Sequence, residues 1–411
     1  MFSLHWRVIS IFRCVMMLAL AGTGVWGCQA SPRYACSPVP VAPSPANDRY
    51  PAVEKPVADS LAAVLATNAA VPATTPRPLQ VLVLPGGVDG APYTSGVLVG
   101  WSKTGQRPTF DVVTGVSSGA LIGVYAFLGP KYDADLQRLI VTLKTADLVK
   151  LRPVSSLLLH GSLSSMKPAE RLIRTEIHDG VLADLRQAHA EGRRFFVGTM
   201  ALQTKRLVVW DVGAIASSDR PDADELVRKV LLAAFSYPGF APPVKFNLEV
   251  NGQCYCEEHS DAGTVAVAFV RFGPVAGWPE PGAPVRPGWL AGSNLYVLAS
   301  RQLYSNPTPV PERALARGMT AIDAAIEALA QAQIGRIHSL CAVSGMRFNL
   351  LAMPQELSRK PVTLTELFPT DAPEMFAIGY EAGASGPRWR LTPPGAEPGE
   401  ESIPRSGLAL D

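Results

Sequence analysis

The stretch 110–123 restricts the fold of this chain most, because it places Ser117 at the centre of Gly115-x-Ser-x-Gly119. Residues 110–114 are apolar and β-branched, which predicts a buried strand. Apolar residues at helical spacing follow the second glycine. A serine on a sharp strand-to-helix turn needs a strained backbone, and flanking glycines permit the close approach. We therefore expect its hydroxyl to project at a helix N-terminus, where free amides stabilise an oxyanion.

A second strand and a glycine-rich turn lie upstream of the serine. Residues 80–84 are Gln-Val-Leu-Val-Leu, a short buried strand, and they run directly into Pro85-Gly-Gly-Val-Asp-Gly90. A helix is then predicted over residues 93–101. The order strand, glycine loop, helix, strand and serine turn is a βαβα alternation, which predicts an α/β layered fold.

The glycine loop is either a plain turn or an anion-binding site. Free N–H groups after a strand form a nest that binds a phosphate or an acyl-transfer oxyanion. No Lys-Ser or Lys-Thr follows the loop, and Gly-x-Gly-x-x-Gly spacing is absent. Because the serine turn lies nearby in the sequence, we favour a loop that binds the oxyanion of an acyl-transfer intermediate.

The rest of the chain to residue 353 adds helices, strands and one notable aspartate. Asp261 stands in Asp-Ala-Gly, a sequence that by itself indicates a turn. Residues 151–167 are apolar and irregular, which makes them a candidate lid. Periodicity predicts strands at 194–200, 206–211, 295–300 and 346–353, and helices at 133–150, 167–191, 224–235 and 319–340.

The composition suits one large globular domain, or two, with flexible ends. The chain has 411 residues, of which 47% are hydrophobic and 18% charged, and its formal net charge is +2. This small net charge gives no electrostatic footprint for nucleic acid. Oligomeric state is left open by the sequence.

The first residues carry a targeting pattern. Arg7 and Arg13 flank a short apolar run, which residues 15–21 continue without a charge. The run predicts a secretory signal over residues 1–27 and is too short for a spanning helix. It ends in Val-Trp-Gly-Cys28, which resembles a bacterial lipobox, whose cysteine is acylated; an ordinary signal peptide is the alternative.

The chain then divides into three parts. Residues 28–78 are rich in Pro, Ala, Val and Ser and predict an extended tether. A folded domain is expected over residues 79–383, and a flexible tail over 384–411. Acyl chains on Cys28 would attach the protein to a membrane leaflet. We expect a periplasmic or outer-membrane lipoprotein of a Gram-negative-type bacterium.

Six cysteines occur, and two of them belong to the targeting region. The other four, at 36, 254, 256 and 341, are able to form disulfides in an oxidising periplasm, but none is assigned. No zinc-binding spacing is present, so we predict no metal site.

Taken in order, these pieces resemble a patatin-like phospholipase domain over about residues 79–383. That family has a glycine-rich oxyanion loop after its first strand, then Gly-x-Ser-x-Gly, then a distant catalytic aspartate. The intervals from Gly86 to Ser117 and from Ser117 to Asp261 are similar to the family's. The stretch 231–244 is similar to its helix-and-proline segment, and 368–383 to its closing helix.

The resemblance implies a three-layer α/β/α fold with a mixed central sheet, and a lipid acyl hydrolase without metal or cofactor. Ser117 would be the nucleophile and Asp261 its general base. The amides of Gly86, Gly87 and Val88 would form the oxyanion hole. Substrates would be acyl esters of phospholipids or other lipids, which suits a membrane-attached enzyme.

Three departures from the family pattern concern the same site. First, the loop has Pro85 at the first glycine and Asp89 at the usual basic position. Second, the segment up to Gly96 is one residue longer. Third, Asp-Ala-Gly reverses the order of the small residues after the aspartate. We expect the acidic Asp89 to weaken binding of anionic substrates.

Two alternatives stay open. Chain order permits an α/β-hydrolase triad of Ser117, Asp261 and His338, although His338 ends a helical run, and His259 is interpreted as a loop residue. The other alternative is a catalytically weak lipoprotein that uses the patatin shape for binding. Labelling with a fluorophosphonate probe separates the hydrolases from the binding protein.

Overall fold

The computed structural model describes residues 37–38, 78–153, 161–250, 253–270, 290–307, 309, 312, 314–357 and 367–400. The predicted signal peptide, most of the tether and Cys28 lie outside these residues. Within the described part of the chain, no helix is both long and apolar enough to cross a membrane. The molecule divides into two compact units, which are described separately.

The smaller unit comprises Met1–Pro40 and Phe246–Glu257. Its described part holds β1 (Ser37–Pro38) and portions of β8 (Val244–Val250) and β9 (Gln253–Asp261). β1 runs parallel to β9, with Ser37 opposite Tyr255, and β8 also pairs with β9.

The larger unit is built on a mixed sheet with the order β9-β6-β3-β2-β10-β11, in which β7 also pairs with β6. The pairs from β6 through β3, β2 and β10 to β11 are parallel, whereas β7 and β9 run antiparallel to β6. The strands are β2 (Gln80–Leu84), β3 (Val112–Val116), β6 (Arg194–Ala201), β7 (Arg206–Asp211), β10 (Asn294–Ala299) and β11 (Arg347–Ala352). A separate short pair joins β4 (Lys150–Leu151) to β5 (Ser164–Ser165).

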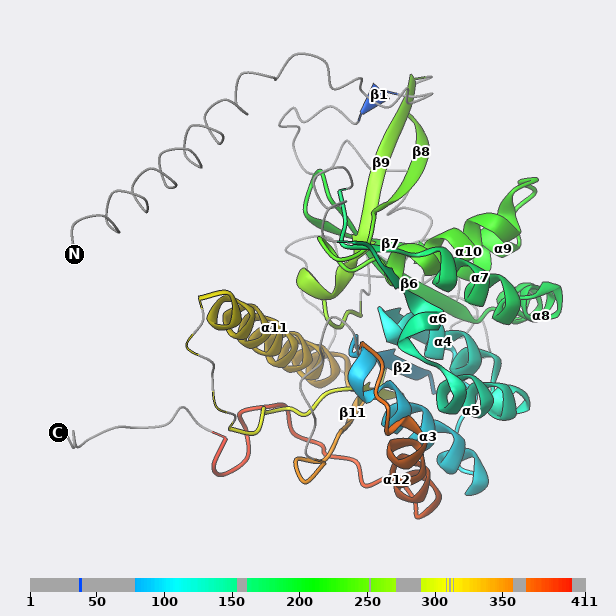
Figure 1. Ribbon diagram of the computed structural model, residues 1–411. Coiled ribbons are helices and arrows are strands. Elements are labelled where there is room, and N and C mark those ends of the chain that lie inside the picture. Colours follow the sequence, from blue (N-terminus) through cyan, green and yellow to red (C-terminus); the bar gives the residue numbers. More distant parts are fainter. Residues whose placement is uncertain are drawn as a thin grey trace, which may run out of the picture. The chain divides into compact units, whose positions relative to one another are not determined.

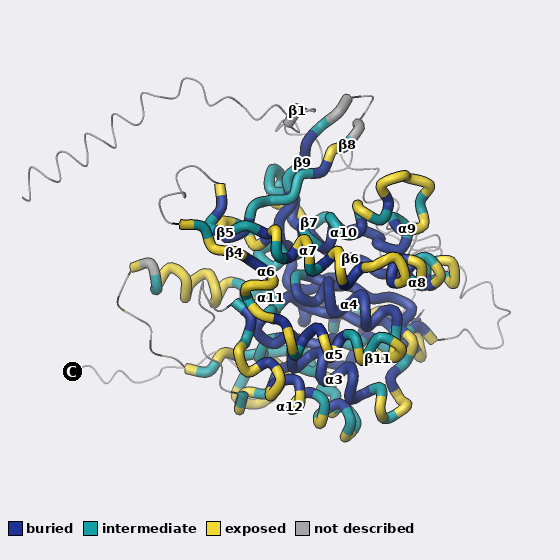
Figure 2. The backbone as a smooth tube through the Cα atoms, turned by 45° about the vertical axis from the view of Figure 1, so that its right-hand side comes forward, coloured by how far each residue is buried: buried dark blue, intermediate teal, exposed yellow. Residues whose placement is uncertain are grey.

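Helices cover both faces of this sheet (Figure 1). On one face, α4 is buried along its whole length, as Figure 2 shows by its dark blue tube. On the other face, Ile334, Ile337 and Cys341 of α11 join a core cluster with Val81 and Val297 of the sheet. The helices are α3 (Ala91–Lys103), α4 (Ser118–Leu128), α5 (Asp133–Thr142), α6 (Thr145–Leu148), α7 (Lys167–Glu176), α8 (Asp179–Ala190), α9 (Val212–Ala216), α10 (Ala223–Ala234), α11 (Ala314–Ser344) and α12 (Ala372–Ala384).

These layers confirm the predicted α/β/α fold with a mixed sheet. The closing helix α12 is fixed by glycines that let it lie almost backbone to backbone with α3. A Cβ on Gly96 would stand 2.1 Å from the Phe376 carbonyl oxygen, and one on Gly379 would stand 2.1 Å from that of Tyr93. A larger residue at either position would push the two helices apart.

Two predicted helices differ from the structure. The helix expected at 167–191 is two helices, because the chain breaks at Ile177 and restarts at His178, whose Nδ1 accepts from the amide of Gly180. The helix expected at 133–150 likewise divides into α5 and α6. β8 was not predicted, and residues 154–160 of the candidate lid lie outside the described part.

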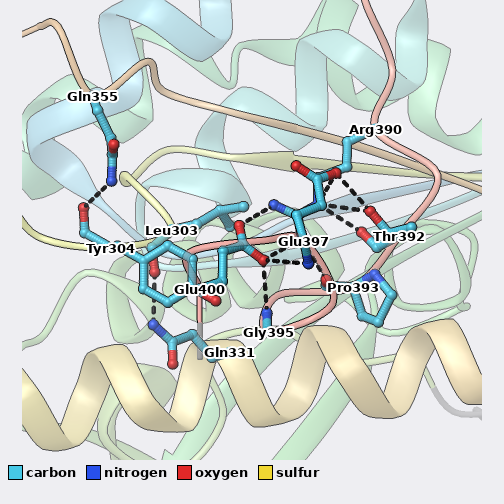
Figure 3. A network of polar contacts seen from close by, with 10 residues as sticks. All are labelled: Leu303, Tyr304, Gln331, Gln355, Arg390, Thr392, Pro393, Gly395, Glu397 and Glu400. Atoms are coloured by element: carbon cyan, nitrogen blue, oxygen red, sulfur yellow. Dashed lines mark hydrogen bonds and ion pairs between the residues drawn. The ribbon is translucent and has the colours of Figure 1, made fainter. Parts of the chain in front are cut away.

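The segment after α12, which the sequence predicts as a flexible tail over 384–411, makes specific contacts at Trp389 and Arg390. Arg390 exchanges both backbone hydrogen bonds with Leu350 of β11, each at 2.8 Å. Its guanidinium binds Glu400 and Glu397 (Figure 3), and the Trp389 ring lies 5.0 Å from that of Trp101. The contacts with Leu350 and Trp101 join residues that are distant in the chain, so the polar, proline-rich local composition did not reveal them. Residues 401–411 lie outside the described part.

Candidate active site

Ser117 lies on the sharp turn that joins β3 to α4, as the sequence predicts. Its backbone has φ 52° and ψ −127°, a conformation that L-residues rarely adopt. A Cβ on Gly115 would stand 2.5 Å from the Gly119 carbonyl oxygen, and one on Gly119 would stand 2.2 Å from that of Leu84. Glycine is therefore required on both sides, and the turn sets Ser117 at the N-terminus of α4, where the helix dipole favours negative charge.

The register of β6 brings Asp261 to the same place. β3 runs along β6 until Val116 lies opposite Gly198, and the next residue of β3's chain is Ser117. β9 approaches along β6 from the opposite direction and ends with Asp261 opposite Thr199. The two strands thus meet end to end, and a side-chain hydrogen bond joins Ser117 to Asp261.

The carboxyl group of Asp261 is buried, with 3% of the residue exposed. Burial raises its pKa from 3.8 to about 6, because a carboxylate loses its hydration there. The hydrogen bonds from Ser117 and from the amide of Gly263, the latter at 2.7 Å, oppose this shift by stabilising the charged form. At neutral pH the Asp261 side chain is therefore ionised, and it is a stronger base than the carboxylate of an exposed aspartate.

Backbone contacts fix the position of Asp261. Its amide donates to the carbonyl of Ser236 at 2.8 Å, in the turn that follows α10. The Ser236 hydroxyl in turn donates to the carbonyl of Pro242 at 2.5 Å. The helix-and-proline segment thereby supports the carboxylate.

The glycine loop lies directly against the serine. A Cβ on Gly86 would stand 3.2 Å from the Cβ of Ser117. The Gly86 amide, however, donates to the Val267 carbonyl at 3.1 Å, so it is occupied in this structure. Within the described part of the chain, the amides of Gly87 and Val88 donate to no acceptor. Gly87 has φ 153°, a conformation that only glycine adopts readily.

Gln333 of α11 holds the chain segment that follows Asp261, and no motif in the sequence predicts this role. Its Oε1 accepts from the amides of Val267 and Ala268, at 2.8 and 3.0 Å, and its Nε2 donates to the Val265 carbonyl at 3.3 Å. The carbonyl of Val267 is the acceptor for Gly86. One glutamine therefore holds the segment that connects Asp261 to the glycine loop. The only sequence signal was a polar residue beside the apolar positions of a helix.

His259 and His338, the two histidines considered for a triad, make their contacts with residues other than Ser117 and Asp261. His259 is on β9 and fully buried, which corrects its interpretation as a loop residue. Its Nδ1 lies 2.8 Å from Thr199 Oγ1, which also accepts from the Trp210 indole at 2.7 Å. The ring of His338, on α11, lies edge-on to that of Phe348 at 5.1 Å. The carboxyl group of Asp261 accepts from Ser117 and from the amide of Gly263, and neither contact involves His338, which gives no support to a triad through this histidine.

The described residues offer no metal site and two buried thiols. The described residues hold no group of three or more His, Cys, Asp or Glu side chains that could bind a metal ion. Cys256 and Cys341 are free and buried, and burial raises the pKa of the Cys341 thiol to about 12, so it stays protonated.

Comparison with known proteins shows a similarity to one family. Residues 82–270 match the family model of patatin-like phospholipases. No curated protein sequence matches the chain. Among solved structures, VipD from Legionella pneumophila is similar with 11% sequence identity and a TM-score of 0.34, over 76% of this chain and 67% of that one. A TM-score this low says nothing about activity.

Proposed function

We propose, from the premise that residues 82–270 form a patatin-like phospholipase domain, that this protein hydrolyses carboxylic esters of lipids with Ser117 and Asp261. Members of that family are lipid acyl hydrolases. The observation that carries the proposal is the hydrogen bond between a serine on a strained turn and a buried carboxyl group of raised pKa. Phospholipids and other glycerolipids are the substrate class.

In the first step Asp261 accepts the hydroxyl proton of Ser117 as the Oγ atom attacks the ester carbonyl carbon. The carbonyl electron pair moves to oxygen and forms a tetrahedral oxyanion. Collapse of this intermediate breaks the bond to the alcohol, which leaves with the proton held by Asp261. Water then attacks the acyl-serine, again giving its proton to Asp261, and the fatty acid departs as Ser117 is restored.

The oxyanion needs donors beside Ser117. We assign this role to the amides of Gly87 and Val88, since that of Gly86 is engaged by Val267. Gly86 contributes by its lack of a side chain, which lets the loop approach the serine. Loss of one oxyanion donor typically costs about 2.7–4 kcal/mol of transition-state stabilisation.

The experiment compares wild-type protein with Ser117→Ala and Asp261→Asn in phospholipid and p-nitrophenyl ester assays. We expect both variants to lose turnover by roughly a thousandfold or more, because each removes an obligatory group. His338→Ala is the matched control and should retain full activity. Loss of activity in His338→Ala with Asp261→Asn unaffected would favour the triad. A folded protein that never labels with a fluorophosphonate at Ser117 would be a binding protein instead.

For the N-terminus we propose acylation of Cys28 after removal of residues 1–27, and attachment to a membrane facing the periplasm. The lipobox-like sequence before Cys28 supports this. Mass spectrometry of the mature N-terminus tests it: wild-type protein should carry acyl chains, and Cys28→Ser should lack them and leave the membrane fraction. Unmodified Cys28 in the mature protein would indicate an ordinary signal peptide.

A further inference from the structure

The glycine loop lies against the residues that follow β10. A Cβ on Gly87 would stand 2.9 Å from Cγ of Arg301, and one on Gly90 would stand 1.7 Å from the carbonyl oxygen of Ser300. The hydroxyl of Ser300 lies 3.0 Å from that of Thr94, one turn further along α3. Ser300 and Arg301 therefore form the surface on which the loop rests.

The loop also carries a buried charge that faces this surface. The side chain of Asp89 is only 12% exposed, and its Oδ2 lies 3.9 Å from Nε of Arg301. A buried carboxylate is costly unless an opposite charge is close. Arg301 therefore places a guanidinium beside the loop at the point where Asp89 supplies a negative charge.

Arg301 is itself held from two further directions. Its Nη2 donates to Oδ1 of Asp323 on α11 at 2.6 Å. Its carbonyl accepts from the amide of Met353, after β11, at 3.4 Å. The guanidinium thus connects the glycine loop to α11, and the planar, always charged group of arginine suits contact with two carboxylates.

We propose that Arg301 is a positioning residue, which orients the glycine loop for the reaction by holding Asp89 and packing against Gly87. The inference rests on the proposed hydrolase function of Ser117. With Arg301 in place, the amides of Gly87 and Val88 keep a fixed direction next to the serine. A preorganised donor costs no reorganisation in the transition state, whereas a mobile one does.

The kinetic test is a double-mutant cycle of Arg301→Gln and Asp89→Asn, with Arg301→Lys as the conservative variant. Arg301→Gln should lower kcat roughly 10- to 100-fold with KM nearly unchanged, because loop geometry matters in the transition state. Arg301→Lys should recover part of kcat. The double variant should be more active than Arg301→Gln, since Asp89→Asn removes the charge left behind. If the losses of kcat in the two single variants simply add in the double variant, or if only KM rises, the proposal is overturned.

Hydrogen–deuterium exchange separates this proposal from the hydrolase function. Amides of residues 86–90 should exchange faster in Arg301→Gln than in wild type, and near the wild-type rate in Arg301→Lys. Arg220→Gln, which breaks an exposed ion pair with Asp222, is the control and should leave these amides unchanged. Unchanged exchange in Arg301→Gln would overturn the positioning role. A wild-type protein without esterase activity would refute the hydrolase function, and the exchange result would still decide the role of Arg301.

Discussion

Gly119 lies so close to Leu84 that a Cβ on the glycine would stand 2.2 Å from the leucine carbonyl oxygen. This contact presses the first turn of α4 onto the end of β2, the strand that leads into the glycine loop. The approach places the loop and Ser117 side by side. Gly119 is therefore needed both for the close packing of α4 on β2 and for the position of Ser117 beside the glycine loop.

Gly119→Ala should therefore destabilise the fold by about 1–3 kcal/mol or more, because the methyl group meets backbone that cannot move away cheaply. Thermal or urea unfolding measures the effect. Gly335→Ala is the matched control, since a Cβ there meets nothing within 4 Å in α11. It should be neutral or stabilising by up to about 1 kcal/mol, as alanine is the better helix former. Equal stability of the two variants would contradict the close contact.

The pH dependence of turnover should follow Asp261. Its pKa is raised to about 6 by burial, so the base form predominates above that pH and is lost below it. We expect kcat/KM to fall roughly tenfold per pH unit below pH 6, since kcat/KM reports ionisations of the free enzyme. An acidic limb near pH 4, the ordinary aspartate range, would contradict the raised pKa of Asp261.

The same shift predicts a pH-dependent stability difference between wild type and Asp261→Asn. The folded-state pKa of Asp261 lies above the unfolded value of 3.8. The stability that this carboxyl group contributes is therefore fully present below pH 3.8 and is lost as pH rises through 6. Between pH 4 and 7.5, wild type should lose roughly 2–3 kcal/mol relative to the variant. Urea unfolding at several pH values measures it. A constant difference would contradict the raised pKa.

The sequence predicts most of this fold because its signals are local. The βαβα order around Ser117 follows from apolar runs, glycines and helical periodicity, which neighbouring residues determine. The break at Ile177 and the packing of residues 385–400 escaped prediction. The break follows a local cap, in which the His178 side chain accepts from the amide of Gly180. The segment at Arg390 is held by backbone hydrogen bonds to Leu350 of β11, a tertiary contact that local sequence does not reveal.

The candidate site divides in the same way. Ser117 is recognisable from five consecutive residues, whereas Arg301 and Gln333 lie far from it in the chain and have no motif of their own. Their positions follow from strand order, because β10 lies beside β2 and α11 covers one face of the sheet. Asp89 stands at a loop position that is usually basic, but a positive charge is still present there, because the Arg301 guanidinium lies beside the Asp89 carboxylate.

Gln333 provides the last prediction, because it holds the segment after Asp261. Gln333→Ala leaves the amides of Val267 and Ala268 without their acceptor, which should cost about 1–3 kcal/mol of stability. Val267 also accepts from Gly86, so the glycine loop should loosen and kcat should fall by roughly tenfold or more.

Gln331→Ala is the matched control on the same helix. Its Nε2 donates to the Leu303 carbonyl at 2.7 Å, so this variant also loses an amide-to-carbonyl bond, but one outside the 265–268 segment. It should lower stability without lowering kcat, measured under conditions in which both variants remain folded. Because both changes remove the same kind of group from α11, a loss of kcat confined to Gln333→Ala would follow from the contacts with Val267 and Ala268. Equal loss in both variants would show that the helix acts only through general stability.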